Sequence, residues 1–187
     1  MMRGVSSLAG AGLLYHAWTG RIPFAESVAG AALEPMLVSD SVQVGAGRDS
    51  TYRFWRNVQN LPSIMKRVER VEQLDQRRSR WTVRTAQGQV VSWVSEITDD
   101  DPGKAIYWRS VDSPVRHEGV VRFEDVPNDA LATKVTVEMR YMLPAGLRGE
   151  MARQALGDPQ RDLHEDLQRL KQTLEHEDFL MAAPPGA

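Results

Sequence analysis

The sequence predicts an α+β domain in which a curved antiparallel sheet wraps around one long C-terminal helix, with a helical appendage at the N-terminus. Three observations lead to this prediction. From residue 68 to residue 143, short runs of alternating apolar and polar residues are separated by turn residues, which is typical of antiparallel strands. Residues 159–177 instead carry leucines three and four positions apart, the spacing of an amphipathic helix. Residues 4–38 follow neither pattern.

The composition excludes several classes of protein. Of 187 residues, 42% are hydrophobic and 26% are charged, which is the balance of a folded domain. A formal net charge of −2 gives no reason to expect nucleic-acid binding. The absence of cysteine excludes disulfides, thiolate nucleophiles and Cys-ligated metal sites.

The folded domain is expected to begin with a strand at Ser39–Val44 and a helix at Arg48–Val58. The helix is predicted because Tyr52, Trp55 and Val58 recur at three-residue steps. A second short helix is expected from Ser63 to Val68, after Pro62.

An antiparallel meander is expected next, because its strands are joined by short turns such as 101–104. The last strand shows the alternation most clearly, since Val135, Val137, Met139 and Tyr141 share one face. The expected strands are Val68–Leu74, Arg80–Thr85, Val90–Thr98, Ala105–Ser110, Gly119–Glu124 and Thr133–Leu143.

The long C-terminal helix is predicted over residues 159–177, with Asp158-Pro159 at its start. Its apolar stripe is formed by Leu163, Leu167, Leu170 and Leu174. A curved sheet with one apolar face can cover this stripe, so residues 39–180 are expected to form one domain. Residues 181–187 are expected to be a flexible tail.

Residues 1–38 form the predicted N-terminal appendage. No charged residue occurs from Gly4 to Trp18, but neither this stretch nor the second one, Phe24–Val38, reaches the length of a bilayer-spanning helix, and Glu26 and Glu34 interrupt the second. We expect two short helices that contact a membrane or a membrane protein, with the domain on the cytoplasmic side. The alternative is a helix pair packed on the domain itself.

Six segments within residues 39–178 are informative as a set: 52–57 (YRFWRN), 60–65 (NLPSIM), 80–83 (RWTV), 93–98 (WVSEIT), 102–110 (PGKAIYWRS) and 165–172 (EDLQRLKQ). As a set they resemble the START-like helix-grip superfamily (SRPBCC), in particular its polyketide cyclase/dehydrase and coenzyme Q-binding branch. The segment at 13–21 (LLYHAWTGR) is similar to part of a bacterial inner-membrane hairpin domain, although the acidic residues that follow depart from that pattern.

The resemblance implies a ligand cavity between the concave face of the sheet and the long helix. We therefore expect a binding or carrier module for a hydrophobic small molecule, such as a quinone, an isoprenoid or another lipid, with no cofactor and no metal. The same residues could instead fill a solid core. The expected walls are Trp81, Val83, Trp93, Trp108, Phe123, Val137, Met139, Tyr141, Leu163 and Leu167.

No known catalytic motif is present, and the four histidines are scattered. His117 is expected in a solvated loop and His164 on the helix surface. Glu96 and Glu138 are expected on the outer face of the sheet, with Glu96 paired to Arg80 or Arg109.

Two other functions remain open from the sequence. An aromatase/cyclase or dehydratase acting on a polyketide-like substrate would need Tyr141, Tyr107 or Arg109 to point inward. An accessory subunit of a membrane complex would dock through its N-terminal helices.

The basic residues between positions 61 and 90 are interpreted as a solvated strand face, although they could also meet phosphates or an anionic membrane. The acidic run 99–101 is interpreted as a hairpin turn and not as a cation site.

Overall fold

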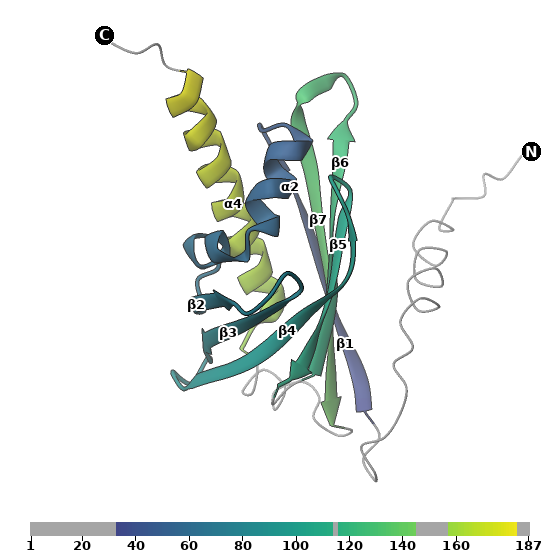
Figure 1. Cartoon of the computed structure of the whole chain (residues 1–187), viewed down its shortest axis with the longest axis vertical. Coiled ribbons are helices and arrows are strands. Elements are labelled where there is room, and N and C mark those ends of the chain that lie inside the picture. Colours follow the sequence, from purple (N-terminus) through teal and green to yellow (C-terminus); the bar gives the residue numbers. More distant parts are fainter. Residues whose placement is uncertain (1–32, 114–115, 145–156, 183–187) are drawn as a thin grey trace, which may run out of the picture. The chain divides into compact units, whose positions relative to one another are not determined.

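The structure is a computed structural model, and it describes residues 33–113, 116–144 and 157–182. Seven strands, two α-helices and one 3₁₀-helix occur in these residues (Figure 1). The elements are β1 (Leu33–Val44), α2 (Arg48–Arg56), η1 (Val58–Ser63), β2 (Val68–Gln73), β3 (Arg78–Arg84), β4 (Val90–Asp101), β5 (Ala105–Asp112), β6 (Arg116–Val126), β7 (Asp129–Pro144) and α4 (Pro159–Ala182).

All described strands belong to one antiparallel sheet in the order β1-β7-β6-β5-β4-β3-β2. Strands β2 to β7 follow one another as the predicted meander, and β1 closes the series by pairing with the last strand. Figure 1 shows a strongly curved sheet with α2 and α4 on the same side. The predicted α+β arrangement is confirmed.

The first strand begins earlier than the sequence predicts. Strand β1 begins at Leu33, six residues earlier than expected, so 33–38 belong to the sheet. The reason lies in the partner strand, because β7 extends to Pro144 and pairs with Leu33 there. Pro35 is tolerated because β1 is an edge strand, where a missing N–H breaks no ladder hydrogen bond. The rest of the predicted appendage lies outside the described residues.

The core lies between the concave face of the sheet and α4. Val135 and Val137 of β7 are buried, as the alternation predicts. The leucine stripe of α4 is also buried, with Leu167 and Leu170 no more than 1% exposed. Helix and sheet therefore bury each other's apolar face, and this burial stabilises the domain.

Polar side chains of α4 cover the free edge of β1. The side-chain amide of Gln160 donates to the carbonyl oxygen of Ser39 at 2.9 Å, and Lys171 Nζ donates to the carbonyl oxygen of Gln43 at 3.0 Å. The carboxylate of Glu175 accepts from the backbone N–H of Gly45 at 3.0 Å. These contacts satisfy an edge that would otherwise be open to another strand.

Helix α2 and η1 also pack against the core. Phe123 of β6 makes edge-to-face contacts with Tyr52 and Trp55 of α2, with ring centroids 5.7 and 6.4 Å apart. The second short helix starts earlier than predicted, since η1 runs from Val58 to Ser63 and contains Pro62. Among the described residues, no helix combines the length and apolar character needed to cross a bilayer.

Candidate ligand-binding cavity

A cavity of about 630 Å³ lies between the concave face of the sheet and α4. Its walls come from β2 to β7, from α2 and η1, and from the first turns of α4. It reaches exposed residues of the β3–β4 hairpin, including Arg84, Gln87 and Gln89, so we place its opening there, beside the start of α4. A volume of this size is typical of a small-molecule site.

Three tryptophans line the cavity wall. Trp81 of β3 and Trp93 of β4 are directly opposed in the sheet register, and Trp108 lies on β5. The indole N–H of Trp81 donates to Ser79 Oγ at 3.0 Å, and that of Trp93 donates to Ser95 Oγ at 3.1 Å. With these two donors satisfied, Trp81 and Trp93 offer the cavity mainly apolar ring surface.

Two titratable side chains, His117 and Tyr141, line the same cavity. The His117 ring packs edge-on against Trp93, with centroids 5.2 Å apart, and lies 5.9 Å from the Tyr141 ring. Burial raises the pKa of Tyr141 to about 12, and the charges of Asp162 and Asp166 add to this effect. The protonated hydroxyl of Tyr141 donates to Met139 Sδ at 3.5 Å.

The predicted solvated position of His117 is wrong. The residue belongs to β6, which begins at Arg116, and it is 7% exposed. Its backbone N–H donates to Ser110 Oγ at 3.0 Å, which fastens this end of β6 to β5. The alternation of β6 then directs His117 to the concave side with Val121 and Phe123.

An ion pair stands at the opening of the cavity. Arg67 Nε lies 2.6 Å from Asp162 Oδ2, which joins the chain before β2 to the first turn of α4. Asp166, one turn further along α4, accepts from the backbone N–H of Lys66 and from Arg169 Nη1, at 3.1 and 2.6 Å. Burial raises the pKa of Asp166 despite these partners.

Nine of the ten predicted wall residues line the cavity, and Phe123 does not. Phe123 instead packs edge-to-face against Tyr52 and Trp55, and of these two Trp55 lines the cavity. The nine that line it are Trp81, Val83, Trp93, Trp108, Val137, Met139, Tyr141, Leu163 and Leu167.

Sequence reasoning missed most of the polar lining. Ser79 and Ser95 could have been found, because each is two positions from a tryptophan assigned to the inner face. Arg67 and Asp162 could not, since their pairing joins residues 95 positions apart.

The acid–base candidates on the strands lie on the outer face, as expected. Arg109 Nη2 donates to Glu96 Oε2 at 2.8 Å, and Arg122 Nη1 lies 2.9 Å from Glu138 Oε1. None of these four residues lines the cavity. His164 is exposed on α4, as expected, with Nδ1 2.8 Å from Asp40 Oδ2.

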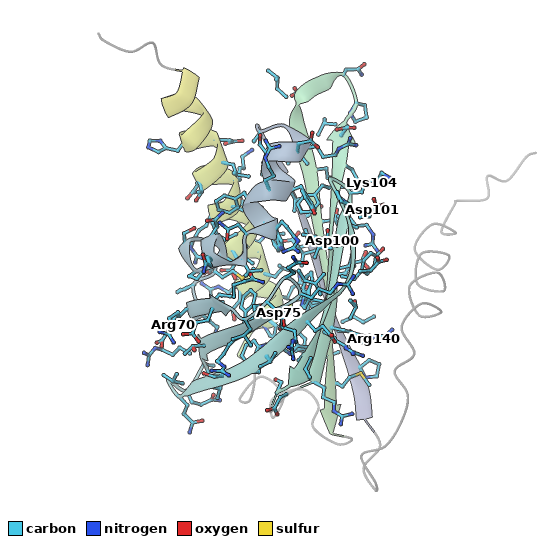
Figure 2. All side chains as sticks on the ribbon, viewed as in Figure 1. Arg70, Asp75, Asp100, Asp101, Lys104 and Arg140 are labelled. Atoms are coloured by element: carbon cyan, nitrogen blue, oxygen red, sulfur yellow. The ribbon has the colours of Figure 1, made fainter. Side chains whose placement is uncertain are left out.

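The basic and acidic clusters are largely internally paired. Ion pairs involve five of the seven basic side chains between 61 and 90: Lys66–Glu165, Arg67–Asp162, Arg70–Glu72, Arg78–Asp75 and Arg84–Glu69. Asp100 binds the Tyr52 hydroxyl and Arg56 Nε, both at 2.7 Å, and Asp101 is paired with Lys104 beside the β4–β5 turn (Figure 2). Within the described ranges no group of acidic or histidine side chains could hold a metal ion.

Comparison with known proteins now assigns the family. The model of the family described as "Polyketide cyclase / dehydrase and lipid transport" matches residues 44–172. The chain belongs to this family. A relative from Streptomyces lincolnensis, an uncharacterized 17.2 kDa protein of the melC2-rnhH intergenic region, is 30% identical over 138 residues, which cover 74% of this chain and 89% of that protein.

Solved structures share the fold of this chain. A crystal structure from Deinococcus radiodurans is 35% identical, with a TM-score of 0.60, and the match covers 76% of this chain and 99% of that one. The Zhui aromatase/cyclase of Streptomyces sp. R1128 is 22% identical, with a TM-score of 0.65, over 81% of this chain and 100% of that one. The START-like helix-grip fold expected from the sequence is thereby confirmed.

Proposed function

We propose that this domain binds a hydrophobic small molecule in the cavity between the sheet and α4, as a carrier or binding module. The observation that carries the proposal is the tryptophan-walled cavity of about 630 Å³. An empty apolar cavity weakens packing, because its lining atoms lack van der Waals partners on one side. A ligand of matching polarity restores those contacts and stabilises the domain.

The wall chemistry indicates the class of ligand. Ring faces and branched aliphatic side chains favour a molecule with flat or branched apolar parts, such as a quinone, an isoprenoid or a polyketide. The charged lining residues Arg56 and Arg67 are each held by an aspartate, at 2.7 and 2.6 Å. A strongly charged ligand would therefore have to compete with an existing ion pair.

The proposal can be tested with the fluorescent probe 1-anilinonaphthalene-8-sulfonate. The wild-type protein should bind it, and extracted bacterial quinones or lipids should displace it. Val83→Trp, which fills the cavity from β3, should lose this binding, whereas Val111→Trp at an exposed position of β5 should retain it. Equal probe binding by the two variants would contradict the proposed site.

A second candidate function is catalysis on a polyketide-like substrate, and the position of His117 and Tyr141 favours it. An aldol cyclisation needs a base that takes a proton from carbon. The resulting enolate carbon attacks a second carbonyl, and the new alkoxide takes up a proton before water is lost. His117 could take the first proton, and the neutral Tyr141 hydroxyl could donate to the carbonyl under attack.

Arg109 and Tyr107, which the cyclase hypothesis also considered, do not line the cavity. Arg109 faces Glu96 on the outer side of the sheet. The test is therefore His117→Gln, assayed with a poly-β-ketone substrate for both binding and ring formation. Ring formation should fall while substrate binding stays the same. Unchanged ring formation in the variant, or no ring formation by the wild-type protein, would contradict this catalytic role and leave ligand binding as the function.

We also propose that the residues before β1 bring the domain to a membrane or to a membrane protein, with the domain on the cytoplasmic side. The support is the uncharged stretch from Gly4 to Gly20 and the low water solubility of the proposed ligands. An accessory role in a membrane complex would use the same segment.

A further inference from the structure

Two buried serines lie side by side on the inner wall of the cavity. Ser79 of β3 and Ser95 of β4 are directly opposed in the sheet register, immediately beside the opposed pair Trp81 and Trp93. Both serines line the cavity, and they are 5% and 7% exposed. Opposed residues on neighbouring strands are close enough for both side chains to reach one ligand atom.

Each serine uses its oxygen as an acceptor but not its hydrogen as a donor. Ser79 Oγ accepts the indole N–H of Trp81 at 3.0 Å, and Ser95 Oγ accepts that of Trp93 at 3.1 Å. A hydroxyl also has one hydrogen to donate. Across 33–113, 116–144 and 157–182, neither hydroxyl hydrogen has an acceptor.

On the other face of the same two strands, an opposed pair of hydroxyls has no tryptophan N–H to accept and bonds within the pair instead. Thr82 of β3 and Ser92 of β4 are also directly opposed, and their oxygens are 3.1 Å apart in a hydrogen bond. Ser79 and Ser95 are instead each held by a tryptophan. Their hydrogens remain free for a third atom, and a buried donor without a partner costs free energy until one arrives.

We propose that Ser79 and Ser95 form a subsite for one carbonyl oxygen of the ligand, as found in a ketone or a quinone. This inference rests on the proposed binding function and narrows its ligand class. A carbonyl oxygen has two lone pairs and accepts two hydrogen bonds, so it matches two neighbouring hydroxyl donors. A carboxylate fits less well, because two neutral donors do not compensate for removing its charge from water.

The subsite is tested with two rigid compounds of nearly equal shape, 9-fluorenone and fluorene, of which only the first has a carbonyl group. Calorimetric titration of the full chain should give about tenfold tighter binding of fluorenone, the effect expected from two hydrogen bonds of ordinary strength. In the double variant Ser79→Ala/Ser95→Ala this preference should disappear while fluorene affinity stays the same. The matched control Ser92→Ala should keep the preference.

Infrared spectra of bound fluorenone give an independent readout. The carbonyl band should move to lower frequency in the wild-type protein and return toward its apolar-solvent position in the double variant. Equal binding of both compounds by wild type, or an unchanged preference in the double variant, would overturn the subsite alone. Failure of both compounds to bind the wild-type protein would overturn the proposed function together with this inference.

Discussion

Trp108 occupies the space where a side chain at position 119 would stand. The two residues are directly opposed in the pairing of β5 with β6. A Cβ atom added to Gly119 would lie 2.4 Å from Cζ2 of Trp108 and 3.0 Å from the carbonyl oxygen of Glu138. The indole therefore has its place in the cavity wall only because residue 119 is glycine.

Gly119→Ala should displace Trp108 and destabilise the domain. The expected loss is about 1–3 kcal/mol in the free energy of unfolding, the usual cost of overpacking a core. Urea unfolding measures this loss, and the near-ultraviolet circular dichroism of the tryptophans should change with it. Gly47→Ala is the control, because no atom lies within 4 Å of the added Cβ. If both variants unfold like wild type, Trp108 does not pack against position 119 as described.

Two neighbouring leucines of α4 should differ in their contribution to stability. Leu170 is 0% exposed and does not line the cavity, whereas Leu167, at 1% exposed, does. Leu170→Ala should cost about 4 kcal/mol and Leu167→Ala about 2 kcal/mol, because Leu167 already lacks packing partners on its cavity side. The comparison uses urea unfolding without ligand, and the reverse order would show that the cavity lies elsewhere.

The sequence predicts well those features that depend on local alternation. The inward side of β7 and the inward position of Trp81, Trp93 and Trp108 follow from the period of two and from large apolar side chains. The buried leucine stripe of α4 follows from the helical period in the same way. These patterns are local, so they can be recognised without knowing which strands pair.

Features that depend on distant pairing were missed. The start of β1 is set by the length of β7, and Glu34 and Pro35 hide it in the sequence. The inward position of His117 depends on where β6 begins after its loop. The exclusion of Phe123 from the cavity depends on α2, whose Tyr52 and Trp55 pack against its ring.

Stability at high pH should depend on Tyr141. Burial raises the pKa of Tyr141 from 10.0 to about 12, so its neutral form is favoured in the folded protein. The stability linked to this shift is fully present below pH 10 and is lost as the pH rises from 10 to 12. Urea unfolding at pH 9, 10 and 11 should show a smaller loss for Tyr141→Phe than for wild type. An identical loss in both proteins would place Tyr141 outside the buried wall.

The membrane proposal predicts a difference between the full chain and a chain beginning at Ala32, which keeps all of β1. The shorter chain should appear in the soluble fraction with the circular dichroism of a folded α+β domain. The full chain should sediment with membranes. Equal distribution of two folded proteins would contradict an anchoring role for the N-terminal residues.

Native mass spectrometry tests the central claim most directly, because it detects a molecule held in the cavity. The full chain is incubated with a bacterial lipid and quinone extract, separated from free lipid and measured intact, beside Val83→Trp and Val111→Trp. The account predicts a small-molecule adduct on wild type and on Val111→Trp that is released on denaturation, and none on the cavity-filling Val83→Trp. A wild-type protein that stays free of adduct, or an adduct equally abundant on all three, would contradict it.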